Sequence, residues 1–197
     1  MEYLLDELLS GTREVVWSST DDQFVVDIHE RPAGLLCGAF NPLHDGHREL
    51  RTVSQQLLRD AVGYEISIHN VEKSSLPQEE ILARSRQFEK AVLAITAAPT
   101  FVQKASLLPE TTFVVGIDTA VRIIDPRFYE ASTAQMHNAL STIRDQGCQF
   151  LVAGRIVGDK FATLSDIELP TAFADLFAEI AETDFRSDLS STGLRKN

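Results

Sequence analysis

The sequence predicts an α/β fold, in which a doubly wound parallel sheet carries helices on its faces. Short apolar runs of strand length alternate with longer segments whose apolar residues recur at helical spacing. Hydrophobic residues make up 44% of the chain and charged residues 24%, the proportions of an ordinary globular domain. Strands that alternate with helices pair in parallel through right-handed crossovers, which favours the doubly wound arrangement.

The first 33 residues are predicted to form an extension to a main domain at residues 34–197. Met1 to Leu9 is predicted as a short helix because its leucines gather on one side. Glu14–Trp17 and Phe24–Ile28 are predicted strands, and the polar turn between them suggests a hairpin. The simplest role of this small helix and hairpin is to cover a sheet edge. A dimer contact or the remnant of a fused domain is the alternative.

In the main domain, the pattern predicts further strands at Gly34–Phe40, Tyr64–Val71, Thr112–Gly116, Gln149–Ala153 and Phe185–Leu189, and a short strand and loop over Phe101–Leu108. Helices are predicted from Asp45 onward, over Gln78–Ala97, around Met136, Leu140 and Ile143, and over Thr171–Glu182. Pro77 and Pro99 fit the two ends of the second helix, and Gly147 fits the end of the third. Polar or glycine-rich segments follow the strand ends, where open α/β sheets bind ligands.

One stretch joins the first strand of the main domain to its first helix: Gly38-Ala39-Phe40-Asn41-Pro42-Leu43-His44-Asp45-Gly46-His47. The proline stops the strand, and Asp45 fits an N-cap, so two histidines lie three residues apart at the helix start. Free N–H groups and the positive end of the helix dipole attract phosphate there, and the glycines allow a close approach. The stretch therefore predicts a phosphate site.

A pair of histidines at this spacing could also be half of a metal site. A zinc site needs further ligands, and neither Cys37 nor Cys148 forms a ligand-type pair with the histidines. We therefore predict no metal held by the protein itself.

The ten-residue stretch resembles the HIGH-type signature of the nucleotidylyltransferase superfamily, and is most similar to that of the nicotinamide and nicotinate mononucleotide adenylyltransferases. A second segment, Ser190-Ser191-Thr192-Gly193-Leu194-Arg195, resembles the Ser-Ser-Thr-x-x-Arg signature of the same family. The two lie in the right order and about one domain apart. The resemblance covers roughly residues 34–195. It implies a Rossmann-like fold and an enzyme of NAD biosynthesis that adenylylates nicotinamide or nicotinate mononucleotide from ATP and releases pyrophosphate.

The resemblance also implies roles for individual residues. His44, His47 and Arg195 would be catalytic, because they would hold the ATP phosphates by charge-assisted hydrogen bonds and neutralise the leaving pyrophosphate. Magnesium would accompany ATP, bound mostly through phosphate oxygens and water. The other ATP-binding residues would be Gly38, Ala39, Phe40, Gly46, Gly116, Asp118, Arg155, Ser190, Ser191 and Thr192. The acceptor would be bound by Lys73, near its phosphate, and by Phe128 or Tyr129, stacked on its pyridine ring.

Several of these assignments have simpler alternatives. Asp118 could serve only as a turn or helix cap, Lys73 could be a solvated loop lysine, and the two aromatics could belong to the core. The only tryptophan, Trp17, lies in the extension, so the loop Asp125–Glu130 offers none to the acceptor ring. Two other functions therefore stay open: nucleotidyl transfer to a cytidylyl- or phosphopantetheine-type acceptor, and nucleotide binding without catalysis.

Composition limits the binding partners and the cellular compartment that we expect for this protein. The net charge of −11 argues against broad binding to nucleic acid or anionic membranes. No apolar run approaches the length of a membrane span, and the acidic start of the chain is unlike a signal peptide. Two cysteines at positions of small buried hydrophobes suggest a reducing compartment. We expect a cytoplasmic protein with ATP and a mononucleotide as partners, and a homo-oligomer stays open.

Overall fold

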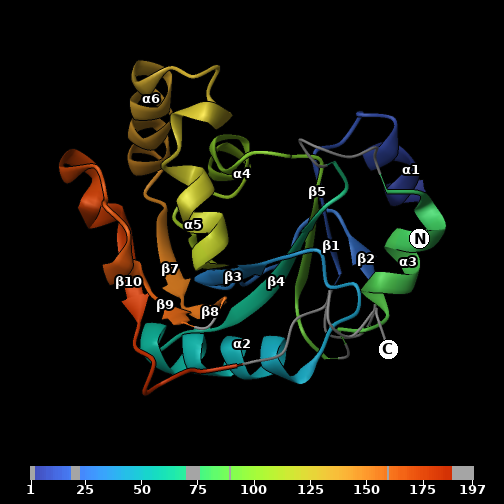
Figure 1. Ribbon diagram of the computed structural model, residues 1–197. Coiled ribbons are helices and arrows are strands. Elements are labelled where there is room, and N and C mark those ends of the chain that lie inside the picture. The colour runs from blue at the N-terminus through green and yellow to red at the C-terminus, as the bar shows by residue number, and fades with distance from the viewer. Residues whose placement is uncertain (1–2, 19–22, 70–75, 89, 159, 188–197) are drawn as a thin grey trace.

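An eight-stranded sheet in the order β10-β7-β6-β3-β4-β5-β1-β2 is the centre of the computed structural model, which describes residues 3–18, 23–69, 76–88, 90–158 and 160–187 (Figure 1). The strands of this sheet are β1 (Val15–Ser18), β2 (Phe24–Val25), β3 (Gly34–Cys37), β4 (Val62–Ser67), β5 (Leu93–Thr96), β6 (Thr112–Gly116), β7 (Gln149–Ala153) and β10 (Phe177–Ile180). A separate hairpin pairs β8 (Arg155–Val157) with β9 (Lys160–Ala162).

The helices lie on both faces of the sheet (Figure 1). They are α1 (Tyr3–Leu9), α2 (Asp45–Leu58), α3 (Gln78–Ser85), α4 (Phe101–Leu107), α5 (Ile117–Ile123) and α6 (Thr133–Asp145), with 3-10 turns η1 (Pro126–Phe128), η2 (Leu164–Asp166) and η3 (Thr171–Leu176). Gly147, at φ +71°, follows α6 as predicted, since glycine adopts this left-handed conformation without strain.

The strand order confirms the predicted doubly wound, Rossmann-like sheet. Neighbouring strands from β10 to β5 pair in parallel. Strand β3 pairs with β4 on one side and β6 on the other, so the chain winds outward from β3 in one direction and then in the other. The switch point of this fold lies between β3 and β6. Ligands of such sheets bind there, beside the carboxyl ends of the strands.

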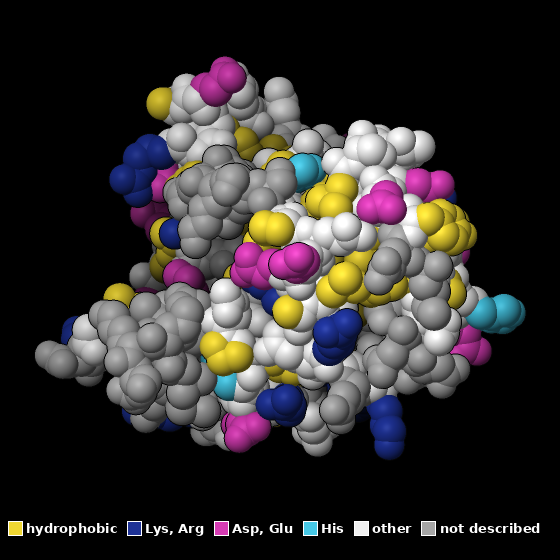
Figure 2. Space-filling view, turned by 90° about the vertical axis from the view of Figure 1, so that its right-hand side faces the viewer, with side chains coloured by type: hydrophobic (Ala, Val, Ile, Leu, Met, Phe, Trp, Pro, Cys, Tyr) yellow, Lys and Arg dark blue, Asp and Glu magenta, His cyan; other side chains and the backbone are white. Residues whose placement is uncertain are grey.

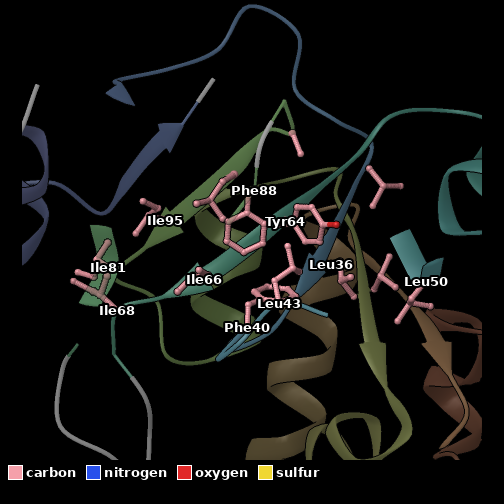
Figure 3. Close-up of a cluster of buried hydrophobic side chains, with 14 of the residues drawn as sticks. Leu36, Phe40, Leu43, Leu50, Tyr64, Ile66, Ile68, Ile81, Phe88 and Ile95 are labelled. Carbon is pink, nitrogen blue, oxygen red and sulfur yellow. The ribbon is translucent and has the colours of Figure 1, made fainter. Parts of the chain in front are cut away.

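Two hydrophobic clusters hold the helices to the two faces. Successive side chains of β4 point to opposite faces of the sheet. Tyr64 and Ile66 join the cluster that contains residues of α1, α2 and α3, while Glu65 faces α4. In β7, Phe150 and Val152 join the cluster that contains residues of α4, α5 and α6. Figure 3 shows the first cluster, in which aromatic and aliphatic side chains fill the space behind the loop that precedes α2.

The N-terminal extension completes one edge of the sheet. Strand β1 pairs antiparallel with β5, and β2 pairs antiparallel with β1, which confirms the predicted hairpin. Trp17 is buried in one cluster, and Leu4, Leu5 and Leu8 of α1 are buried in the other. The extension thus shares its core with the rest of the chain, while the division at residue 34 stays a prediction.

Two sequence predictions around the fifth strand are wrong. The predicted helix Gln78–Ala97 is the shorter α3 followed by β5, whose four residues are all buried between β4 and β1. A strand buried on both faces has no alternation, so its apolar residues could extend a helical stripe. The predicted strand Phe101–Leu108 is helix α4, because Thr100 caps it and accepts a hydrogen bond from the N–H of Gln103 at 3.4 Å.

The C-terminal predictions also need correction. The predicted helix Thr171–Glu182 is η3 followed by β10, because parallel pairing of β10 with β7 overrides the helical spacing of the apolar residues. The predicted strand Phe185–Leu189 is absent as far as Ser187, and its last two residues lie outside the described part. The strands predicted at Gly34–Phe40 and Tyr64–Val71 exist but end earlier, at Cys37 and Ser67.

Surface charge is mixed on the side of the molecule seen in Figure 2, where acidic and basic side chains alternate with small hydrophobic areas. An anion that binds on this side must therefore be held by a local group of donors rather than by a broad positive field. None of the described helices is long and apolar enough to cross a membrane.

Candidate active site

The loop between β3 and α2 places His44 and His47 at the carboxyl edge of the sheet. His44 is the N-cap residue of α2, and His47 lies on the first turn. Their rings stack with 3.7 Å between centroids and 25° between planes. The backbone N–H of His44 donates to Nδ1 of His47 at 3.3 Å. Because Nδ1 accepts this bond, the neutral ring of His47 carries its proton on Nε2, where it can be donated to a ligand.

Both histidines have lowered pKa values. Burial, followed by the charges of His44 and Arg48, lowers the pKa of His47 to about 4. Burial also lowers the pKa of His44, an effect that Asp45 opposes. Both rings are therefore neutral at pH 7 in the free protein. The charge-assisted contact expected from the sequence requires a bound anion, whose negative charge raises both pKa values.

The loop is held from behind by one aromatic residue and by α3. Phe40 is 1% exposed, and its ring packs edge-on to His47 with 4.9 Å between centroids. Gln87 donates to the carbonyl of Phe40 at 3.1 Å and accepts from the N–H of Leu43 at 2.8 Å. Arg84 donates to the carbonyl of Ala39 at 2.7 Å. Phe40 therefore supports His47, and only its backbone is available to a nucleotide.

The first cavity, of about 280 Å³, lies between the start of α2 and the carboxyl ends of β3, β6 and β7. Nδ1 of His44, which lines it, is buried and has no hydrogen-bond partner within the described residues. Asp118 and Arg155 form an ion pair at 3.3 Å in the same cavity. The structure thus brings together these predicted residues: His44, Gly46, His47, Gly116, Asp118 and Arg155.

The described chain returns to this cavity at its end. Phe185 is buried in the cluster beside α2, and Ser187 lines the first cavity. A Cβ atom on Gly46 would lie 2.5 Å from Oγ of Ser187, so a side chain at position 46 would force Ser187 to shift. The remaining predicted phosphate contacts lie outside the described residues: Lys73, Ser190, Ser191, Thr192 and Arg195.

A second cavity, of about 510 Å³, lies beside the first and shares Cys37 and Thr119 with it. It lies at the carboxyl ends of β3 and β4 and at the start of α4. The predicted residues Gly38 and Ala39 line this cavity rather than the first. Nε of Arg84, another lining residue, is buried with no partner in the described part of the chain. The wall of the second cavity therefore contains a buried donor, close to the histidine loop, that bonds to no described group.

A buried ion pair forms the floor of the second cavity. Glu65 is fully buried, and its two oxygens accept from Oγ1 of Thr96 at 2.7 Å and from Nζ of Lys104 at 2.5 Å. Burial lowers the pKa of Lys104, but the charge of Glu65, the charge of Cys37 and the hydrogen bond to Glu65 together outweigh burial, so the pKa is raised. Burial and Glu65 together raise the pKa of Cys37 well above its ordinary value. The floor therefore carries a fixed ion pair beside a neutral thiol.

Sequence reasoning missed Glu65, Arg84, Phe101 and Lys104 as lining residues of the second cavity. A charged residue inside an apolar strand was the available signal for Glu65. Lys104 gave none, because its helix was predicted to be a strand.

The two aromatics predicted to contact the acceptor lie elsewhere. Phe128 is 45% exposed, with the guanidinium of Arg122 5.9 Å from its ring centroid. The hydroxyl of Tyr129 donates to the carbonyl of Ile123 at 2.9 Å, and its ring packs against the cluster near α6. Neither residue lines a cavity described above. The aromatic ring at the second cavity belongs to Phe101 instead.

A Rossmann-like sheet with paired histidines at its switch point is typical of nucleotide-binding α/β proteins. Comparison with protein families identifies the family within this class. A family model described as cytidylyltransferase-like matches residues 35–197. The chain therefore belongs to the cytidylyltransferase-like family, within the HIGH-type nucleotidyltransferases. A comparison with curated proteins finds no match.

Proposed function

We propose that the protein transfers the adenylyl group of ATP to nicotinamide or nicotinate mononucleotide and releases pyrophosphate. The observation that carries the proposal is the junction of the two cavities beside the histidine loop, where they share Cys37 and Thr119. Two anionic substrates that repel each other need adjacent pockets and donors at the point where they meet. Membership of a nucleotidyltransferase family supports the reaction type.

ATP would occupy the first cavity. Asp118 would accept hydrogen bonds from the ribose hydroxyls, after exchanging its exposed pairing with Arg155. The triphosphate would lie at the start of α2, where backbone N–H groups and Nε2 of His47 can donate to it. Gly46 keeps this approach open, because a side chain there would collide with Ser187.

The acceptor would occupy the second cavity, with its phosphate toward the junction with the first cavity and its pyridine ring toward Phe101. Nε of Arg84 and the ammonium group of Lys104 are the donors available to its polar groups. In the reaction, an oxygen of the acceptor phosphate bonds to the α-phosphorus of ATP, and the bond from that phosphorus to the bridging oxygen of the β-phosphate breaks. Negative charge grows on the leaving pyrophosphate, where the donors at α2 stabilise it.

Magnesium would enter with ATP, and its chemistry is to neutralise charge on the phosphates. Within the described residues, no group of three or more His, Cys, Asp and Glu could hold a metal ion by itself. The exposed carboxylate of Asp118 is the acidic group of the first cavity, so the donor set fits a metal ion that arrives already bound to phosphate oxygens.

The description of the matched family favours a second candidate, in which CTP replaces ATP. Purified protein with magnesium is incubated with ATP or CTP and with each pyridine mononucleotide, and products are separated by chromatography. We expect a dinucleotide and one pyrophosphate per turnover with ATP. Product only with CTP, or only with a different phosphorylated acceptor, would contradict the adenylyl assignment. Absence of product with every pair, together with nucleotide binding, would identify a binding domain.

A further inference from the structure

A third cavity, of about 400 Å³, lies between α2 and the end of α3, and we call it the arginine cavity. Arg48 and Arg51 of α2 line it, together with Arg86, which directly follows α3. No acidic residue belongs to its described lining. None of its lining residues belongs to the first or second cavity, so it is a separate site of small-molecule size.

Arg51 is held in place before any ligand arrives. Its Nε donates to the carbonyl of Val62 at 2.5 Å, and its guanidinium lies 5.4 Å from the ring centroid of Tyr64. Burial raises the pKa of Tyr64, although the nearby charges of Arg51 and Arg48 oppose this rise. A fixed guanidinium loses little freedom when it binds an oxyanion, so the cavity contains one preorganised donor.

The other two arginines have little compensating charge. The guanidinium of Arg86 makes no ion pair or hydrogen bond with the described residues, and Arg86 is exposed. Arg48 pairs with Asp45 at 3.3 Å, but the carboxylate of Asp45 is 93% exposed, so solvent screens this pair. Three cations thus line one cavity of a protein whose net charge is −11. Such an arrangement is stabilised by an anion that the three groups share.

We propose that the arginine cavity binds a small phosphate-bearing anion, the size of pyrophosphate or a mononucleotide, outside the site of nucleotidyl transfer. The cavity volume limits the ligand to a small molecule, and the overall negative charge disfavours a polyanion. The proposal does not depend on the identity of the transferred nucleotide.

The arginine cavity also adjoins the histidine loop. Leu43 and Gln87 form part of its wall, and the side chain of Gln87 holds the N–H of Leu43 and the carbonyl of Phe40. Gln87 thus contacts both the arginine cavity and the loop. An anion in the cavity therefore lies next to the hydrogen bonds that hold the loop. Hydrogen exchange at the amide of Leu43 is a local reporter of its binding.

The test separates this site from the histidine site. In a His44→Ala/His47→Ala background, inorganic pyrophosphate and ATP are titrated separately by calorimetry at constant ionic strength. We expect saturable binding to remain and its Kd to rise about tenfold on adding Arg86→Gln, the effect of losing one charge-assisted contact. The matched control is Arg59→Gln, at the exposed C-cap of α2 and away from all three cavities, and it is expected to leave the Kd unchanged.

Tighter binding of pyrophosphate than of ATP identifies an inorganic ligand, and the reverse order identifies a nucleotide. Loss of all binding in the histidine background, or equal Kd values for the Arg86→Gln and Arg59→Gln proteins, overturns the proposal. If the histidine variant does not fold, the same arginine variants are compared in the wild-type background. There, Arg86→Gln is expected to weaken one of two binding events, and a single event insensitive to Arg86→Gln overturns the proposal.

Discussion

In the first cavity the histidines beside α2 are uncharged near neutral pH, whereas the floor of the second cavity carries a complete ion pair. The two sites differ in how the cost of burying a charge is avoided or offset. The histidines avoid the cost of burial by losing their protons, and they can gain charge when an anion binds. Glu65 and Lys104 instead form a buried ion pair, in which the attraction between the two groups offsets the cost of burying them. The first cavity can respond to its ligand, while the floor of the second is fixed.

The largest expected effect comes from breaking the fixed pair. Lys104→Met leaves the buried carboxylate of Glu65 without its partner, and we expect it to lower the free energy of unfolding by about 3–5 kcal/mol. Urea denaturation measures this change. The double variant Glu65→Met/Lys104→Met removes both charges and is expected to recover most of the loss. A single variant as stable as the wild type would show that the pair does not stabilise the fold.

The next largest effect is expected from the histidines of the first cavity. His47→Ala removes the Nε2 donor at the start of α2, and we expect kcat of the proposed reaction to fall by about 10²-fold. Its thermal unfolding is expected to stay cooperative, because His47 lies at a cavity rather than in the core. The matched control, exposed His29→Ala, is expected to keep the wild-type rate. Equal rates for the two variants would remove His47 from the reaction.

Variants of two aromatic residues test where the acceptor binds. Phe101→Leu reduces the ring surface at the second cavity and is expected to raise KM for the mononucleotide by about two- to tenfold, with KM for ATP unchanged. Phe128→Leu, at the position favoured by the sequence, is expected to change neither constant. The opposite pattern, with Phe128→Leu raising KM for the mononucleotide, would place the acceptor near η1.

The last prediction is a pH dependence of stability to which His47 of the first cavity contributes. The pKa of His47 is about 4 in the folded protein, against about 6.5 for an unfolded histidine. Between these values the unfolded chain binds more protons, so the free energy of unfolding falls as the pH falls from about 6.5 to about 4. Urea midpoints at pH 7 and pH 5 measure this, and His47→Gln is expected to reduce the difference. An unchanged difference would show that the histidine does not titrate as described.

The same contrast explains how far sequence could predict the site. His44 and His47 lie three residues apart on one helix start, so local spacing was enough to place them together. Glu65 and Lys104 lie 39 residues apart and meet only because the fold brings the side chain of Lys104, on α4, to the side chain of Glu65, on β4. The parallel, doubly wound sheet, which follows from the alternation of strands and helices, was also predicted. Strand β5 was missed because burial on both faces removes the alternation that marks a strand.

If the two cavities bind different substrates, a crossed binding measurement will show it most directly. A non-hydrolysable ATP analogue and nicotinate mononucleotide are each titrated calorimetrically into the His47→Ala protein and the Glu65→Met/Lys104→Met protein. We expect His47→Ala to weaken binding of the ATP analogue alone and the double variant to weaken binding of the mononucleotide alone. If both ligands instead respond to the same variant, they share one cavity and the division of the site is wrong.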